Sequence, residues 1–136
     1  MKILVVHREV SVSHQVKSIL HDNETVVRYY NSGLDGLLAI RVEEFDLIIC
    51  GTDLPVITGF ELIRTVRTHS INASTPVVFI ADELSGKSEY LANALGVAGT
   101  LVRQTMDHEL APLVDATMLG WKPNVRVSHK YDLPPN

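Results

Sequence analysis

Charged residues and a glycine follow four apolar runs of the sequence, at the points where the runs stop. The four segments are His7–Arg8–Glu9, Gly51–Thr52–Asp53, Ala81–Asp82 and Arg103–Gln104. Two guanidinium groups brought together can bind a phosphate or a carboxylate, so Arg8 and Arg103 are a candidate anion site. Nearby carboxylates offer the alternative that both cations are neutralised as internal ion pairs, and these carboxylates are Glu9, Asp53, Asp82 and Glu83.

Five short β-branched runs alternate with longer segments in which apolar residues recur every three or four positions. The runs predict strands at residues 2–6, 25–30, 47–50, 76–80 and 100–102. The longer segments predict five amphipathic helices, the second with the apolar stripe Leu34, Leu37, Leu38 and Val42. Ser32 with Asp35, and Thr58 with Glu61, have the spacing of a helix N-cap and its third residue.

This alternation predicts an α/β fold, a five-stranded parallel sheet that is doubly wound as (βα)5 with helices on both faces. The runs ILVV, LIIC and VVFI lack polar alternation, as strands covered on both faces do. Right-handed crossovers favour the flavodoxin-like strand order 2-1-3-4-5. In such sheets ligands bind outside the carboxyl ends of the strands, so the sheet would bring the four polar segments to one edge.

The composition excludes several classes of protein. The chain has 136 residues, a formal net charge of -4 and 46% hydrophobic residues, as expected of one globular domain. The acidic balance argues against direct nucleic-acid binding, and no apolar stretch approaches the roughly 20 residues that span a bilayer. Cys50 is the single cysteine, so no disulfide within the chain and no CxxC pair can form. Since no signal-peptide pattern is present, we expect a cytoplasmic protein.

No Gly-rich phosphate loop and no Ser/His/Asp or Cys/His set is visible, so we expect neither an enzyme nor a bound cofactor. The six histidines are too scattered for a metal motif. The helical period stops near Gly120, which predicts a domain over residues 1–119 and a tail or linker over residues 120–136. Within that tail, Val125 and Val127 alternate with polar residues and would also suit a short edge strand.

Gly51 stands at the tip of the third predicted strand, where α/β proteins commonly place their chemistry. Two hypotheses account for it. The glycine could leave room for a ligand, or it could serve a turn whose backbone needs a positive φ.

The stretch DLIICGTDLPVITG resembles the receiver domain of two-component response regulators. Members of that family usually have strand–Asp–x–x–x–Pro–x–x–x–Gly here, and this chain keeps the spacing with Gly51, Pro55 and Gly59. The segments ILVV, PVVFIA and ALGVAGTLVR also stand where the family would place them. The resemblance covers about residues 1–119 and implies a signalling domain with the fold described above.

The resemblance also implies a phosphorylated aspartate and a Mg²⁺-binding acidic pair, and the chain departs from the family at all three positions. Gly51 replaces the aspartate, and it cannot supply the carboxylate nucleophile of aspartyl phosphorylation. His7 and Arg8 replace the acidic pair, although Mg²⁺ prefers hard oxygen ligands. Asp53 could be a relocated phosphoacceptor, but neither an acidic pair nor a Ser or Thr accompanies it.

Four further positions that the resemblance assigns to phosphoryl reading and switching also differ. Ala81 replaces a Ser or Thr, Arg103 replaces a Lys, and Gln104 replaces the proline after that Lys. Thr100 replaces an aromatic switch residue on the last strand. The resemblance therefore predicts a degenerate receiver that acts through phosphorylation-independent protein–protein interaction. The alternative is a small-molecule or anion sensor that uses the emptied pocket, with Arg8 and Arg103 as its cations.

The family also implies a partner-binding face around the fourth helix, the last strand and the fifth helix. The residues of this chain on that predicted face are Tyr90, Asn93, Thr100, Arg103, Gln104 and His108. The partner could be another protein or a second copy in a homodimer, and an output domain could follow the tail.

Overall fold

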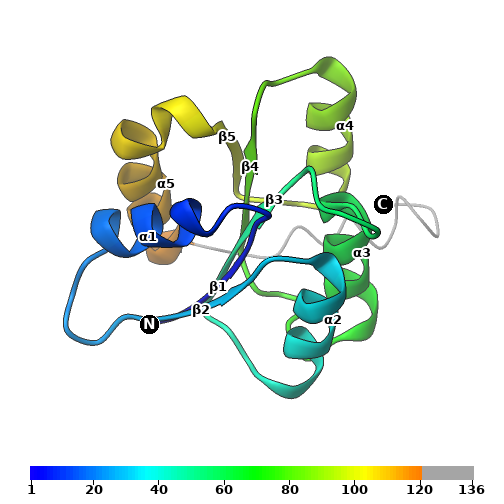
Figure 1. Ribbon diagram of the computed structural model, residues 1–136, viewed down its shortest axis with the longest axis horizontal. Helices are drawn as coiled ribbons and strands as arrows, with labels where there is room; N and C mark the ends of the chain where they lie inside the picture. Colours follow the sequence, from blue (N-terminus) through cyan, green and yellow to red (C-terminus); the bar gives the residue numbers. More distant parts are fainter. Residues whose placement is uncertain (121–136) are drawn as a thin grey trace.

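The structure, a computed structural model, describes residues 1–120 of the chain (Figure 1). Its strands are β1 (Lys2–Val6), β2 (Val26–Tyr30), β3 (Leu47–Gly51), β4 (Val77–Ala81) and β5 (Gly99–Val102). Its helices are α1 (Val10–Ile19), α2 (Gly33–Val42), α3 (Gly59–His69), α4 (Gly86–Ala94), the 3₁₀ helix η1 (Arg103–Thr105) and α5 (Met106–Gly120). All strand pairs are parallel, and the order β2-β1-β3-β4-β5 confirms the predicted fold.

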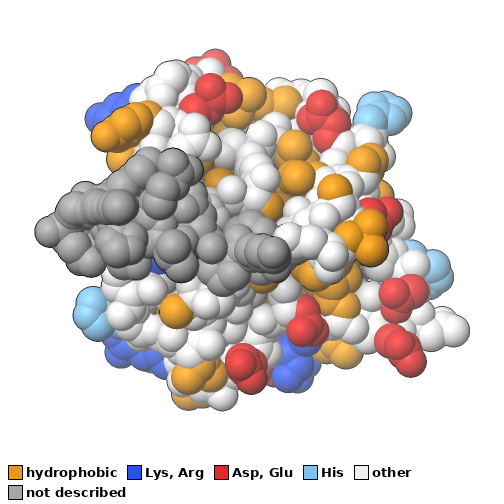
Figure 2. Space-filling model, turned by 180° about the vertical axis from the view of Figure 1, so that it is seen from behind, with side chains coloured by type: hydrophobic (Ala, Val, Ile, Leu, Met, Phe, Trp, Pro, Cys, Tyr) orange, Lys and Arg blue, Asp and Glu red, His pale blue; other side chains and the backbone are white. Residues whose placement is uncertain are grey.

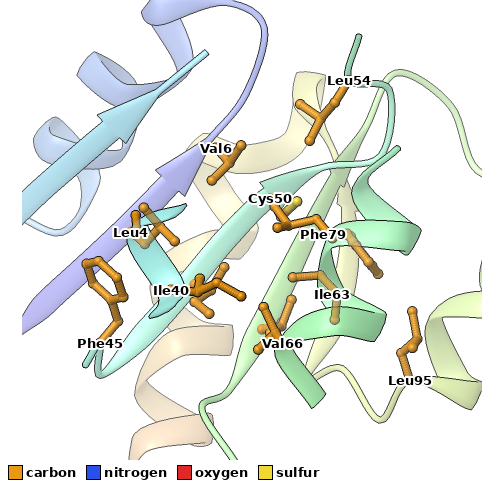
Figure 3. Packing of buried hydrophobic residues seen from close by; sticks show 14 of the residues in the cluster. Leu4, Val6, Ile40, Phe45, Cys50, Leu54, Ile63, Val66, Phe79 and Leu95 are labelled. Carbon is orange, nitrogen blue, oxygen red and sulfur yellow. The ribbon is translucent and has the colours of Figure 1, made fainter. Parts of the chain in front are cut away.

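Two layers of helices sandwich the sheet, with α1 and α5 on one face and α2, α3 and α4 on the other (Figure 1). Alternate residues of the central strands supply the two cores. On β1, Ile3 and Val5 pack toward α1 and α5, while Leu4 and Val6 pack toward α2 and α3 (Figure 3 shows the second cluster). Because β1, β3 and β4 are covered on both faces, their sequences are apolar without interruption.

The helix starts match the predicted caps. The Ser32 hydroxyl accepts from the Asp35 N–H at 3.2 Å, and Thr58 with Glu61 forms a reciprocal capping box. A third cap, Ser85 with Ser88 at the start of α4, was not predicted, because Ser is a less common third residue of a capping box than Glu or Gln.

The predicted stripe of α2 is wrong at three of its four residues, while Leu37 packs against the core as predicted. Leu34, Leu38 and Val42 are 49%, 63% and 82% exposed, and the helix buries Gly33, Gly36, Ala39 and Ile40 instead. A Cβ on Gly36 would lie 2.9 Å from a Val6 methyl and 3.1 Å from a Leu62 methyl. The helix therefore approaches the sheet through its smallest residues, and larger apolar residues are left facing outward.

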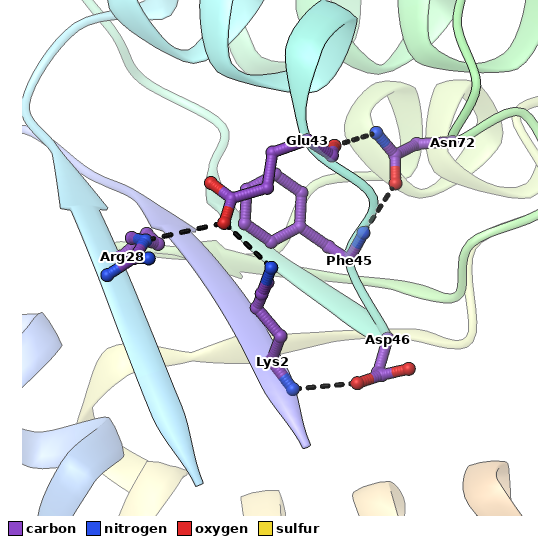
Figure 4. Close-up of polar contacts among 6 residues, drawn as sticks. All are labelled: Lys2, Arg28, Glu43, Phe45, Asp46 and Asn72. Atoms are coloured by element: carbon purple, nitrogen blue, oxygen red, sulfur yellow. Dashed lines mark hydrogen bonds and ion pairs between the residues drawn. The ribbon is translucent and has the colours of Figure 1, made fainter.

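A buried asparagine joins α2 to the chain between α3 and β4. The Asn72 side chain accepts from the Phe45 N–H at 2.8 Å and donates to the Glu43 carbonyl at 2.9 Å (Figure 4). It also donates to the Ile40 carbonyl at 2.8 Å. The Glu43 carboxylate meanwhile pairs with Lys2 at 2.8 Å. These contacts fix the amino-terminal entry to β3, the strand that ends at Gly51.

Arg67 of α3, like Asn72, links separate segments of the chain through hydrogen bonds to main-chain carbonyls. Its guanidinium donates to the carbonyls of Leu95 at 2.9 Å, Ala73 at 3.2 Å, Thr75 at 2.6 Å and Gly96 at 3.3 Å. Burial lowers the pKa of Arg67 to about 10, so it remains a cation at neutral pH.

The surface seen from behind carries separate acidic and hydrophobic side chains on the part of that face that the structure describes (Figure 2). Among the helices of residues 1–120, none combines the length and the apolar character that crossing a bilayer demands.

Candidate functional site

The carboxyl edge of the sheet brings the polar segments together as predicted. The backbone ladders set Val6 beside Cys50, Gly51 beside Ile80, and Ala81 beside Val102, so the chain leaves four neighbouring strands at one edge. A small hollow there is lined by His7, Arg8, Glu9, Thr52, Asp53, Ile80 and Asp82. Its volume is about 10 Å³, which is at the lower limit for a single water molecule.

The imidazole of His7 fills the space beside Gly51. A Cβ on Gly51 would lie 2.8 Å from His7 Cδ2, closer than carbon atoms pack in folded proteins. Gly51 is the last residue of β3, and it is not among the positive-φ residues of the described chain. The positive φ predicted for Gly51 is wrong, and a neighbouring side chain occupies the space beside its Cα.

His7 is held in place as a neutral ring. Its Nδ1 accepts from the Glu9 N–H at 3.1 Å, and its main-chain carbonyl accepts from the Tyr29 hydroxyl at 2.7 Å. Burial, followed by the positive charge of Arg103, lowers the pKa of His7 below its usual value of 6.5, although Glu9 and Asp82 act in the opposite direction. The ring is therefore a packed, uncharged element of this edge at neutral pH.

Both guanidiniums at this edge are ion-paired, which is the alternative predicted for them. Arg8 Nη1 lies 2.7 Å from Asp53 Oδ2, and Arg103 Nη1 lies 2.7 Å from Glu9 Oε1. Arg103 also donates to the Ser11 hydroxyl. The hydrogen bond and the charge of Arg103 lower the pKa of Glu9. An external anion would have to displace these carboxylates from both cations.

The loop between β3 and α3 explains the rest of the motif. Gly59 is required because a Cβ there would collide with the main-chain oxygen of Gly51. Within the loop, the Ile57 N–H donates to the Pro55 carbonyl at 2.8 Å, and Val56 between them has a φ of 68°. Positive φ in a β-branched residue is rare and strained, so this loop conformation lowers the stability of the folded chain.

The residues at this edge do not fit the Mg²⁺ ion that the family resemblance implies. Mg²⁺ takes oxygen ligands in octahedral geometry, whereas His7 and Gly51 offer no side-chain oxygen and Arg8 is a cation. Asp53, the nearest carboxylate in the loop, is bound to Arg8. Across residues 1–120, no group of three or more His, Cys, Asp or Glu side chains is placed to hold a metal ion.

The remaining predicted site residues are spread over two places. Ala81 ends β4 and lies beside Val102, close to the edge described above. Thr100 is partly buried on β5 beside Phe79, and Gln104 is exposed in η1. Tyr90 and Asn93 on α4 and His108 on α5 are exposed, so they do not join the site around Gly51.

The sequence of this fold matches a family model described as "Response regulator receiver domain" over residues 3–115. The chain belongs to that family. The receiver domain is also 25% identical over 114 residues to a probable transcriptional regulator, ycf29, of Pyropia yezoensis, covering 84% of this chain and 51% of the relative. It is 27% identical to the two-component response regulator-like APRR5 of Arabidopsis thaliana, covering 83% of this chain and 21% of that protein. The chain thus spans about half of the first relative and about a fifth of the second.

Other relatives are matched over most of their length. The chemotaxis protein CheY-3 of Vibrio cholerae is 27% identical over 106 residues, which cover 76% of this receiver domain and 80% of the relative. The solved structure of Vibrio cholerae CheY4 superposes with a TM-score of 0.75 at 29% identity, covering 85% of this chain and 96% of that one. The non-phosphorylated HemR receiver domain of Leptospira biflexa gives a TM-score of 0.78 at 18% identity over 90% and 98% of the two chains, a likeness of fold.

Sequence reasoning missed three contributors to this edge. Ser11 and Tyr29 support Arg103 and His7 through hydrogen bonds, and Val56 carries the strained turn. A tyrosine at the end of a predicted strand next to the first strand could have signalled the contact with His7. Nothing in the sequence signals a positive φ at a valine.

Proposed function

We propose that this receiver domain signals by binding other proteins and does not accept a phosphoryl group. The observation that carries the proposal is the packing of the His7 ring against Gly51, at the position where the resemblance places the reactive aspartate. A carboxylate nucleophile is absent from that position, and a neighbouring side chain occupies its volume. The name of one relative, "response regulator-like", is in keeping with such a role.

The electrostatics of the edge support the same proposal. In a receiver that transfers a phosphoryl group, cations must be available for the charge of the transferred group. Here Arg8 and Arg103 are each paired at 2.7 Å with a carboxylate of the same chain. Asp53 is engaged with Arg8, and so a relocated phosphoacceptor at Asp53 is disfavoured. We accordingly propose a non-enzymatic, cytoplasmic signalling domain.

We place the interaction surface on the face formed by α4, β5 and α5. Tyr90 is 72% exposed there, and exposed tyrosines are frequent anchors in protein interfaces. A second copy of the chain is the partner that can be tested without knowledge of the pathway. The proposal extends to an output domain in the whole protein, since the longer relatives extend well beyond the matched region.

The first test is incubation with acetyl phosphate and Mg²⁺, followed by measurement of the intact mass. We expect no gain of a phosphoryl group and an unchanged amide spectrum. The matching test of the surface is sedimentation over a range of concentrations, for the parent chain and for Tyr90→Ala. An adduct that maps to Asp53 would overturn the phosphorylation-independent mechanism, and self-association that Tyr90→Ala leaves intact would count against the chosen face.

A further inference from the structure

A hollow among the described residues lies between α3 and α4, away from the edge around Gly51. Its volume is about 560 Å³, against about 10 Å³ beside His7. Ligand sites for small molecules fall in the range of roughly 300–1,000 Å³ and are mostly apolar. Its size and position make this hollow the stronger candidate for a ligand site.

The floor of the hollow is apolar and built from both helices. Phe60 comes from the first turn of α3, where its ring lies 5.0 Å from the ring of Phe79. Leu91 comes from α4, and Leu95, its C-cap residue, is almost fully buried. Figure 3 shows Leu95 on the α4 side, opposite Ile63 and Val66 of α3. A rigid aromatic or branched group would replace water over these side chains.

The hollow exists because α4 has small residues where it meets the sheet. Its buried residues are Ala92 and Ala94, and its longer side chain Leu91 lines the hollow without filling it. Arg67 holds the carbonyls of Leu95 and Gly96, which fixes the carboxyl-terminal end of α4 at this distance from α3. The space is therefore a consequence of the packing and is present before any ligand binds.

The walls of the hollow carry positive charge. Arg64 of α3 and Lys87 of α4 line it from the two sides, and both side chains are exposed. No ion pair among residues 1–120 involves Lys87. The carboxylate of Glu61 also lines the hollow but accepts from the Thr58 N–H at 2.9 Å. The amino-terminal ends of α3 and α4 add the positive end of each helix dipole at the same rim.

We propose that this hollow binds a small organic acid, a flat or branched apolar body that carries one carboxylate. The body would lie on Phe60, Leu91 and Leu95, and the carboxylate would pair with Lys87 at the rim. This class suits the site because an apolar floor with cations at its edge favours an amphipathic anion over a neutral or a fully hydrated one. The proposal is independent of how the domain signals, and a bound acid would add ligand control of α4.

The test is an NMR titration of the amide signals of the whole chain with phenylacetate and, separately, with 2-phenylethanol. The alcohol has the same ring and a similar length but lacks the charge. We expect saturable shifts at Phe60, Leu91 and Leu95, and tighter binding of phenylacetate. Lys87→Gln should weaken phenylacetate binding about three- to tenfold and leave binding of the alcohol unchanged. Lys17→Gln on α1 changes the same charge on the opposite face of the sheet and should have no effect.

Three results would overturn the proposal. One is the absence of saturable shifts with phenylacetate at tens of millimolar. Another is equal affinity for the acid and the alcohol together with no effect of Lys87→Gln. The third is a set of shifts centred on His7 and Gly51, which would instead support the anion site at the sheet edge. None of these results bears on the intact-mass test, so the two proposals can fail separately.

Discussion

At the scale of single residues, His7 and Gly51 act as one structural unit. The imidazole stands where a Cβ at position 51 would need space, and its Nδ1 is tied to the Glu9 N–H. Because interiors are packed to the density of crystals, a side chain can be added on one strand end only if the other is reduced. The size of the side chain at position 51 and the size of the side chain at position 7 are therefore physically coupled.

This coupling predicts non-additive stabilities. Gly51→Ala should cost about 1–3 kcal/mol, because the new methyl group meets the His7 ring. In a His7→Ser background the same change should cost close to nothing, so the coupling energy should be at least about 1 kcal/mol. Urea unfolding of the four chains measures this cycle. Equal costs in both backgrounds would show that His7 is not what excludes a side chain at position 51.

The buried, neutral state of His7 predicts a pH dependence of stability. Its pKa is lowered from 6.5 in the folded chain, so as the pH falls below 6.5 the unfolded chain binds a proton that the folded chain does not. The free energy of unfolding should therefore decrease on acidification from pH 7.5 through 6.5, by at most about 1.4 kcal/mol per pH unit from this residue.

The matched variant is His7→Asn, whose side-chain oxygen can accept from the Glu9 N–H without titrating. Its stability should fall less between pH 7.5 and pH 5.5 than that of the parent chain, as measured by chemical unfolding at each pH. Glu9 also has a lowered pKa, but it loses its contribution only at lower pH, since its usual value is 4.5. Identical slopes in parent and variant would contradict a buried neutral His7.

The strained turn at Val56 predicts that a substitution there raises the free energy of unfolding, whereas Gly51→Ala should lower it. The side chain is 84% exposed, so Val56→Gly loses little packing and relieves the strain of a φ of 68°. Relief of such strain should stabilise the folded chain by about 1–3 kcal/mol. The greater conformational freedom of glycine in the unfolded chain should offset up to about 1 kcal/mol of this gain. We expect a net stabilisation of about 1 kcal/mol in thermal or urea unfolding.

Val42→Gly is the control for this prediction. Val42 is also an exposed valine, at 82%, but it ends α2 with an ordinary φ. Glycine there should destabilise the chain by up to about 1 kcal/mol. Destabilisation by both substitutions would mean that Val56 is not strained.

At the scale of helices and strands, some features follow from local chemistry and others from tertiary packing. The caps at Ser32 and Thr58 were predictable because a cap needs only its neighbours in sequence. The strands were predictable within one residue at most ends, since β-branched runs between helices leave few alternatives. The buried face of α2 was not, because Gly36 and Ala39 are hidden by close contact with the sheet and carry no hydrophobic signal of their own.

The Asn72 network predicts a strong dependence of these elements on one polar side chain. Asn72→Ala should cost about 2–4 kcal/mol, because the Phe45 N–H and the Ile40 carbonyl lose their buried partner. Amide hydrogen exchange should become faster at the start of β3 and at the end of α2. Asn93→Ala, an exposed change on α4, is the control and should stay within about 0.5 kcal/mol. A similar small cost for Asn72→Ala would mean that water replaces the amide.

At the scale of the whole molecule, the fold determines which residues meet and the side chains determine what they can do. The strand order follows from alternation and handedness, so the meeting of residues near 8, 53, 81 and 103 could be predicted. How they pair could only be stated as alternatives, because Arg8 had several carboxylates within reach. The filling of the edge by His7 depends on the direction of one ring, which no spacing encodes.

The proposal that only side chains prevent phosphorylation of this fold predicts that restoring those side chains makes the domain accept a phosphoryl group. The combined variant His7→Asp, Arg8→Asp, Gly51→Asp, Ala81→Thr and Arg103→Lys supplies an acidic pair, a nucleophile, a hydroxyl and a lysine at adjacent strand ends. We expect it to gain one phosphoryl group from acetyl phosphate by intact mass. Mg²⁺ should raise its Tm, because an ion that binds the folded chain stabilises it.

Gly51→Asp alone should gain no phosphoryl group, since the His7 ring still occupies the site and Arg8 still opposes a metal ion. An amide spectrum of this variant would check that it is folded. If the single variant were modified as readily as the combined one, the aspartate would be the only missing part, and the packing of His7 would have no bearing on function. If the combined variant folded and bound Mg²⁺ yet stayed unmodified, this sheet edge would differ from that of an active receiver in its backbone and not only in its side chains.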